Sequence, residues 1–192
     1  MAQRIAEQFP GAILINDDGK NEIADLILIR RLGERAVVRL YHCKYQSGKG
    51  ANLDDLHELL GQVQRSARWA SDPRSFWKEA AIRIGGRFKI KAGDETAARA
   101  YLAECAEKPP LTEFILTAVQ PGIHASRMKP GDNVNVVLTM TDNVVRAHNA
   151  TFNVVIADPV TKSVQQRDDT RPLRELVTVH AQRTSRRSPS PN

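Results

Sequence analysis

Residues 22–45 decide the fold, and they read EIADLILIRRLGERAVVRLYHCKY. Branched and aromatic residues dominate 23–29 and 36–45, and this composition predicts two β-strands. Between them, 31–35 contains Gly33, a residue that favours a turn. The stretch therefore predicts two neighbouring strands of one sheet.

The polar residues of this stretch are expected to meet at one edge of the sheet. In a hairpin the start of one strand lies beside the end of its partner, which brings Asp25 close to Lys44. Side chains alternate along a strand, so His42 and Lys44 share one face while Cys43 points to the other. A carboxylate, an imidazole and a lysine in one place can support metal-dependent phosphodiester hydrolysis.

The elements outside this stretch follow from hydrophobic periodicity and turn residues. We expect helices at 2–8, 52–69, 75–84, 94–107, 132–148 and 174–182, and further strands at 12–16, 87–91, 113–120 and 151–157. A strand, a helix and a strand at the end of this series predict a parallel crossover on the same sheet. The fold class is therefore α/β, with a mixed central sheet and flanking helices.

At this point the sequence resembles the PD-(D/E)XK nuclease superfamily, whose core carries an Asp on one strand and a (D/E)xK tripeptide on the next. Asp25 matches the first element and Lys44 matches the lysine of the second. The strand at 22–27 is similar to the Gly-x-Ile-Asp strand of RecB-type nucleases, and Gln62 matches a Gln on their following helix. With VQPG at 119–122, these motifs resemble a nuclease-like module fused to helicases in bacterial defence proteins.

The resemblance implies a restriction-endonuclease-like αβββαβ core and a DNA (endo)nuclease that depends on Mg²⁺ or Mn²⁺. Asp25 would be the main metal ligand, and Glu22 or His42 would complete the coordination. Lys44 would assist the attacking water, and Gln62 would position the water or a phosphate.

The sequence departs from the superfamily pattern at position 42, where His replaces an acid. Mg²⁺ prefers oxygen ligands, so Glu22 or Glu58 could supply the missing carboxylate, or the site could favour Mn²⁺ or be inactive. Asp17 is interpreted as a simple turn residue, whereas Asp18 stays open because it is near the same edge.

The positive charge of the chain is concentrated in one segment. The net charge is +6, and residues 65–91 account for all of it, with eight basic and two acidic residues. A local basic surface on a neutral body suggests a polyanionic partner, here the DNA backbone. The expected contacts are Arg65, Arg68, Arg74, Lys78, Arg83, Arg87, Lys89 and Lys91, followed by a basic tail with Arg183, Arg186 and Arg187.

Length and composition limit the other possibilities. The 192 residues suffice for one domain, expected at 1–160 with the basic segment inserted, and for an extension at 161–192 that ends in a disordered tail. Two cysteines without a CxxC motif argue against a disulfide scaffold or a cysteine zinc site. The sequence contains neither a long apolar run nor a signal peptide, so we expect a cytoplasmic protein away from membranes.

Three functions remain open at this stage. The first is a nuclease acting in bacterial defence or DNA processing. The second is an inactive nuclease-fold module that binds DNA or assembles with a helicase. The third is a protein-interaction domain that does not bind nucleic acid. The expected partners are DNA, a helicase or other defence-complex subunit, and a second copy of the chain in a homodimer.

Overall fold

The computed structural model describes residues 1–19, 21–44, 53–84, 86, 88–121, 132–157 and 177–178. The helices are α1 (Ala2–Gln8), α2 (Leu53–Ser66), α3 (Arg68–Ser71), α4 (Pro73–Ile84), α5 (Glu95–Glu107) and α6 (Asn133–Ala147). The strands are β1 (Ile13–Asn16), β2 (Leu26–Leu32), β3 (Arg35–Cys43), β4 (Lys89–Ala92), β5 (Leu111–Pro121), β6 (Thr151–Ala157) and β7 (Val177–Thr178).

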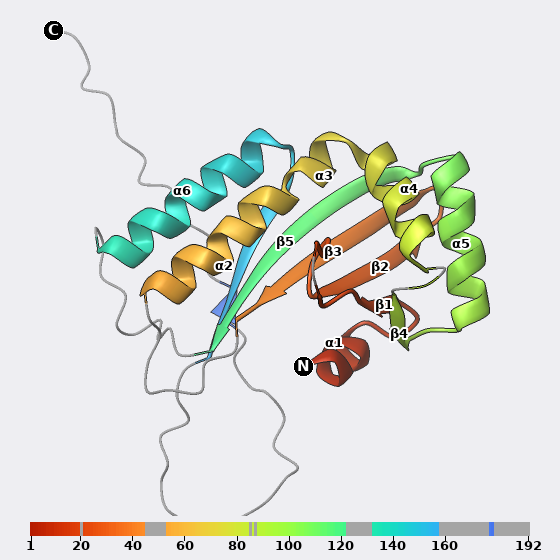
Figure 1. The fold of residues 1–192 in the computed structure, drawn as a ribbon, viewed down its shortest axis with the longest axis horizontal. Helices are drawn as coiled ribbons and strands as arrows, with labels where there is room; N and C mark the ends of the chain where they lie inside the picture. The colour runs from red at the N-terminus through yellow and green to blue at the C-terminus, as the bar shows by residue number, and fades with distance from the viewer. Residues whose placement is uncertain are drawn as a thin grey trace, which may run out of the picture.

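The strands form one mixed sheet in the order β4-β1-β2-β3-β5-β6-β7 (Figure 1). The pairs β4–β1, β1–β2, β2–β3 and β6–β7 are antiparallel, whereas β3–β5 and β5–β6 are parallel. The order α1, β1, β2, β3, α2, β5 has the αβββαβ sequence of elements, with α3, α4, β4 and α5 between α2 and β5. The α/β prediction and the parallel crossover through α6 are thus confirmed.

The sheet separates two hydrophobic cores. On one face, Val38 and Leu40 of β3 pack in a core that includes buried side chains of α2, α4, α5 and α6. Figure 1 shows α2 and α6 lying across this face. On the other face, Tyr41 and Cys43 contribute to a smaller core closed by Ile5 of α1. Because side chains alternate along β3, successive residues near its end face the two cores in turn.

The β2–β3 hairpin has the turn that the sequence predicts. Leu32 pairs with Arg35, which leaves a two-residue loop. Gly33 occupies its first position with a φ of +63°, a left-handed conformation that glycine adopts without steric cost. This turn fixes the register that positions Asp25 beside the end of β3.

β2 begins at Leu26 rather than at Ile23. Ile23 and Ala24 are fully buried, but they belong to the loop before the strand. The buried Asp17 carboxylate accepts a hydrogen bond from the Ile23 N–H at 2.7 Å, so this N–H is satisfied outside the sheet. Ile23 and Ala24 are thus apolar because they are buried in this loop, and not because they belong to a strand.

Two further boundaries differ from the prediction. The helix expected at 52–69 ends at Ser66, and Ala67 separates it from the short α3. Val177–Thr178 pair with β6, so the helix expected at 174–182 is wrong at these residues. The disordered tail expected at 182–192 lies outside the described residues. None of the described helices combines the length and the apolar character needed to cross a membrane.

Candidate functional site

The start of β2 and the end of β3 meet as the sequence predicts. Leu26 pairs with Tyr41, and just beyond this pair the Asp25 Oδ2 accepts a hydrogen bond from the Cys43 N–H at 2.7 Å. Asp25 is half-buried, and burial raises its pKa, with a smaller contribution from the charge of Asp18. The carboxylate therefore lies at the edge where β3 ends.

Asp25 belongs to a cluster of three carboxylates. One carboxylate oxygen from each of Asp18, Glu22 and Asp25 lies within 4.8 Å of the others. Glu22 Oε2 accepts a hydrogen bond from the Gly19 N–H at 3.0 Å, which holds its side chain toward the loop. Burial raises the pKa of Glu22, and the negative charge of Asp25 adds to the rise. Glu22 thus joins Asp25 as predicted, and Asp18, left open by the sequence, joins them.

Asp17 fixes the loop that carries these acids. The interpretation of Asp17 as a simple turn residue is therefore wrong. Its side chain is completely buried and forms an ion pair with Arg83 of α4, with N–O distances of 2.9 and 3.2 Å. Arg83 also donates to the Asn21 carbonyl at 2.7 Å. From α2, the Ser66 hydroxyl donates to the Ile23 carbonyl at 2.8 Å. Contacts from two helices therefore hold the acidic loop.

His42 lies on the α2 face of β3, opposite to the face of Cys43, as predicted. It is 1% exposed, and neither ring nitrogen has a hydrogen-bond partner within the described part of the chain. Burial, with a smaller effect from the charge of Arg65, lowers the pKa of His42 to about 4. The imidazole is therefore neutral at neutral pH.

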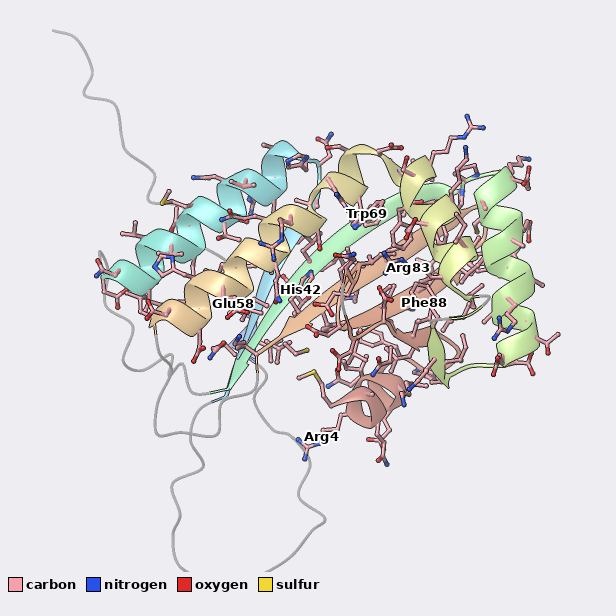
Figure 2. The ribbon with its side chains drawn as sticks, in the orientation of Figure 1. Arg4, His42, Glu58, Trp69, Arg83 and Phe88 are labelled. Carbon is pink, nitrogen blue, oxygen red and sulfur yellow. The ribbon has the colours of Figure 1, made fainter. Side chains whose placement is uncertain are left out.

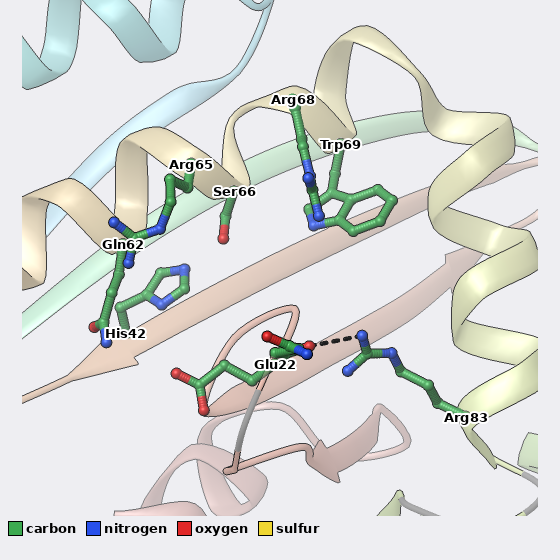
Figure 3. A pocket seen from close by; sticks show the side chains of 9 residues that line it. Glu22, His42, Gln62, Arg65, Ser66, Arg68, Trp69 and Arg83 are labelled. Carbon is green, nitrogen blue, oxygen red and sulfur yellow. Dashed lines mark hydrogen bonds between the residues drawn. The ribbon is translucent and has the colours of Figure 1, made fainter.

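A cavity of about 620 Å³ joins His42 to the acidic loop. Figure 3 shows His42, Gln62 and Arg65 on one side, Arg83 on the other and Glu22 between them. Gln62 of α2 thus faces the site, as the resemblance implied. The lining consists of Asn21, Glu22, His42, Gln62, Arg65, Ser66, Arg68, Trp69 and Arg83.

Lys44 and Glu58 form an ion pair at the end of β3. The Lys44 Nζ lies 2.5 Å from the Glu58 Oε2 on α2, and this hydrogen bond raises the pKa of Lys44. Glu58 is not part of the three-carboxylate cluster, so of the two acids considered for the missing ligand, Glu22 is the one placed there. In Figure 2, the labelled Glu58 and His42 lie close together between α2 and the end of β3.

Gln120 belongs to the VQPG motif at 119–122, but the sequence alone indicates no role for its side chain. It is fully buried in β5, and neither atom of its amide group has a hydrogen-bond partner among the residues the structure describes. Gln120 follows Val119, which pairs with Cys43. It therefore lies on the strand next to the end of β3. The signal was an amide residue within an apolar strand, directly before the Pro121 turn.

The basic segment does not form one surface. Arg65, Arg68 and Arg83 line the cavity, although Arg83 is engaged by Asp17. Other members lie elsewhere: Arg74 and Lys78 border a second depression with Ile82 of α4 and Glu107 of α5, and Lys89 and Lys91 are exposed on the edge strand β4. Arg87 lies outside the described residues. Of the arginines that line the cavity, only Arg65 and Arg68 thus form no ion pair with a carboxylate in the described part of the chain.

No protein-family model matches this sequence, and comparison with curated proteins and with solved structures finds no significant similarity. The resemblance to PD-(D/E)XK nucleases therefore depends on the motifs quoted above and on the residues that the fold brings together.

Proposed function

We propose that this protein is a metal-dependent DNA nuclease. The observation that carries the proposal is the cluster of Asp18, Glu22 and Asp25, whose carboxylate oxygens lie within 4.8 Å of one another at the end of β3. Glu22 of this cluster also lines a cavity that presents Arg65 and Arg68. Acidic and basic groups on one cavity match the needs of a phosphodiester substrate and a cation.

The residues of the cluster fit a divalent cation. Three carboxylates at such short range repel one another, and a hard cation with oxygen ligands removes this repulsion. His42 lines the neighbouring cavity but is not a member of this three-carboxylate cluster, and an imidazole ligand would suit Mn²⁺ better than Mg²⁺. When bound at such a site, the cation lowers the pKa of water and offsets charge on the phosphate.

The other residues would act on the substrate directly. Arg65 and Arg68 would bind phosphate oxygens, and Gln62 would hold a phosphate or the attacking water through its amide. Lys44 would stabilise the negative charge that develops on the phosphate. For this it must exchange its contact with Glu58 for the substrate, and the exposed position of Glu58 permits that exchange.

Cleavage of plasmid DNA in Mn²⁺ and in Mg²⁺ tests this function. We expect the native chain to cleave, and Asp25→Asn and Lys44→Met to lose activity by at least about 100-fold, the range in which acid–base and electrostatic groups contribute. Glu113→Gln is the matched control, because Glu113 is exposed on β5 far from the end that pairs with Cys43. Equal cleavage by all four proteins would refute the assignment.

An inactive nuclease-fold module is the second candidate. Two observations favour it: Lys44 is held by Glu58, and position 42 is His rather than an acid. Calorimetry with Mn²⁺ and Mg²⁺ separates the candidates, since absence of heat with intact DNA binding would favour the inactive module. A DNA-binding assay across a salt series decides between both and a protein-interaction domain, whose affinity for DNA would be absent or independent of salt.

A further inference from the structure

The cavity has the size of a nucleotide site rather than of a duplex groove. At about 620 Å³ it falls within the range of small-molecule sites. Its walls are α2, α3, α4 and the loop with Asn21 and Glu22, and His42 lines it from β3. A stacked base pair within a double helix cannot reach the inside of such a pocket, whereas an unpaired nucleotide can.

The lining supplies a group for each part of a nucleotide. Arg65 and Arg68 are exposed cations without a carboxylate partner in the described chain, and guanidinium groups bind phosphate in a bidentate manner. Trp69 is half-buried beside them, with the Arg68 guanidinium carbon 4.5 Å from the centre of its ring. Gln62 faces the same cavity with an amide group able to hydrogen-bond to a base (Figure 3).

We propose that this cavity binds one unpaired nucleotide of single-stranded DNA, with its phosphate on Arg65 and Arg68 and its base against Trp69. The proposal deepens the proposed function, on which it rests for the choice of DNA as ligand. It names the substrate as a single strand, or a strand end, rather than an intact duplex. Base stacking on an aromatic side chain tolerates every base, so binding is expected to be independent of sequence.

The first experiment measures DNA binding in EDTA, so that no cleavage or metal is required. Anisotropy of a labelled oligothymidylate is compared with that of a blunt hairpin duplex over a salt series. We expect the single strand to bind at least tenfold more tightly. The double variant Arg65→Ala/Arg68→Ala should weaken binding of the single strand and reduce the salt slope by about 1.4, the value for two lost phosphate contacts. Arg74→Ala/Lys78→Ala removes the same charge from another surface, and it should leave the slope unchanged.

The second experiment uses tryptophan fluorescence, because the chain has two tryptophans in different surroundings. Trp77 is fully buried and donates to Thr112, whereas Trp69 faces the cavity. Oligothymidylate should quench the native chain and Trp77→Phe, but not Trp69→Phe. Trp69→Leu should lower affinity by about fivefold or more, as loss of a stacked base does.

Several results would overturn the proposal. These are equal affinity for duplex and single strand, an equal effect of the two double variants, or quenching that survives in Trp69→Phe. Equal quenching by free thymidine monophosphate and by the oligonucleotide would assign the cavity to free nucleotides instead. Single-strand binding without cleavage would refute the proposed nuclease but support this site. Cleavage by the native chain, together with unaltered single-strand binding by Arg65→Ala/Arg68→Ala, would support the nuclease but refute this site.

Discussion

The buried ion pair between Asp17 and Arg83 gives a test of how the acidic loop is held. In Arg83→Met, the stem of the side chain keeps its packing but the guanidinium is lost. The Asp17 side chain is 0% exposed and would lose both contacts with Arg83, at 2.9 and 3.2 Å. The Ile23 N–H still donates to the buried carboxylate, but the guanidinium that offsets its charge is gone, and breaking a buried pair in this way costs about 3–5 kcal/mol. We therefore expect Arg83→Met to lower the free energy of unfolding by this amount.

Urea unfolding measures the change, and a double-mutant cycle isolates the pair. Asp17→Asn/Arg83→Met should lose less than the sum of the single variants, with a coupling of about 1–3 kcal/mol. Arg146→Met is the control, because Arg146 forms a surface pair with Asp142 whose loss costs at most about 1 kcal/mol. A loss in Arg83→Met no larger than in this control would refute the structural role of Arg83. If Arg83→Met instead lowers the affinity for DNA without lowering stability, Arg83 contacts DNA, as the sequence analysis expected.

Three further predictions use the same unfolding assay. Because the pKa of His42 is about 4 in the folded chain and 6.5 ordinarily, the unfolded chain binds a proton first as the pH falls. Stability should then decrease between pH 6.5 and 4 by up to about 3 kcal/mol, and His42→Gln should lack this decrease. Ser66→Ala leaves the buried Ile23 carbonyl without its donor and should cost about 1–3 kcal/mol, whereas an unchanged free energy of unfolding would show that this contact does not hold the loop. Asp94→Ala removes the cap that accepts from the Ala97 N–H at 2.6 Å and should cost about 1 kcal/mol.

Local patterns were sufficient to predict the hairpin that builds the site. Alternation along β3 and the turn at Gly33 fix which residues share a face, and both signals lie within the hairpin itself. The approach of Asp25 to the end of β3 follows from this register, as the hydrogen bond from the Cys43 N–H confirms. Gln62 was expected at the site only because it matches a Gln of the nucleases that the sequence resembles, and it lines the cavity.

The burial of Asp17 could not be predicted in this way, because its partner Arg83 is 66 residues away. An aspartate two residues before a glycine has the local pattern of an exposed turn, and only the packing of α4 against the loop places it in an internal ion pair. The Ser66–Ile23 contact, across 43 residues, has the same origin. Long-range polar contacts of this kind leave no periodic signal.

The basic segment shows how charge along the chain can mislead about charge in space. Residues 65–91 pass through two helices, α3 and α4, after the end of α2, and then enter the edge strand β4. Each change of direction turns the next basic side chains to another part of the surface. Neighbours in sequence such as Arg68 and Arg74 therefore line different depressions.

The arrangement links the acidic loop and the cavity mechanically. α2 supplies Gln62 and Arg65 to the cavity, and one residue later Ser66 donates to the loop that carries Glu22. α4 supplies Arg83 to the same loop. Because both helices pack in the larger core, a shift of α2 or α4 would displace the acidic cluster together with the wall of the cavity. Rigid elements thus set the position of the acidic cluster relative to the cavity. The proposed hydrolysis of a phosphodiester requires such a fixed arrangement of its cation site and its phosphate site.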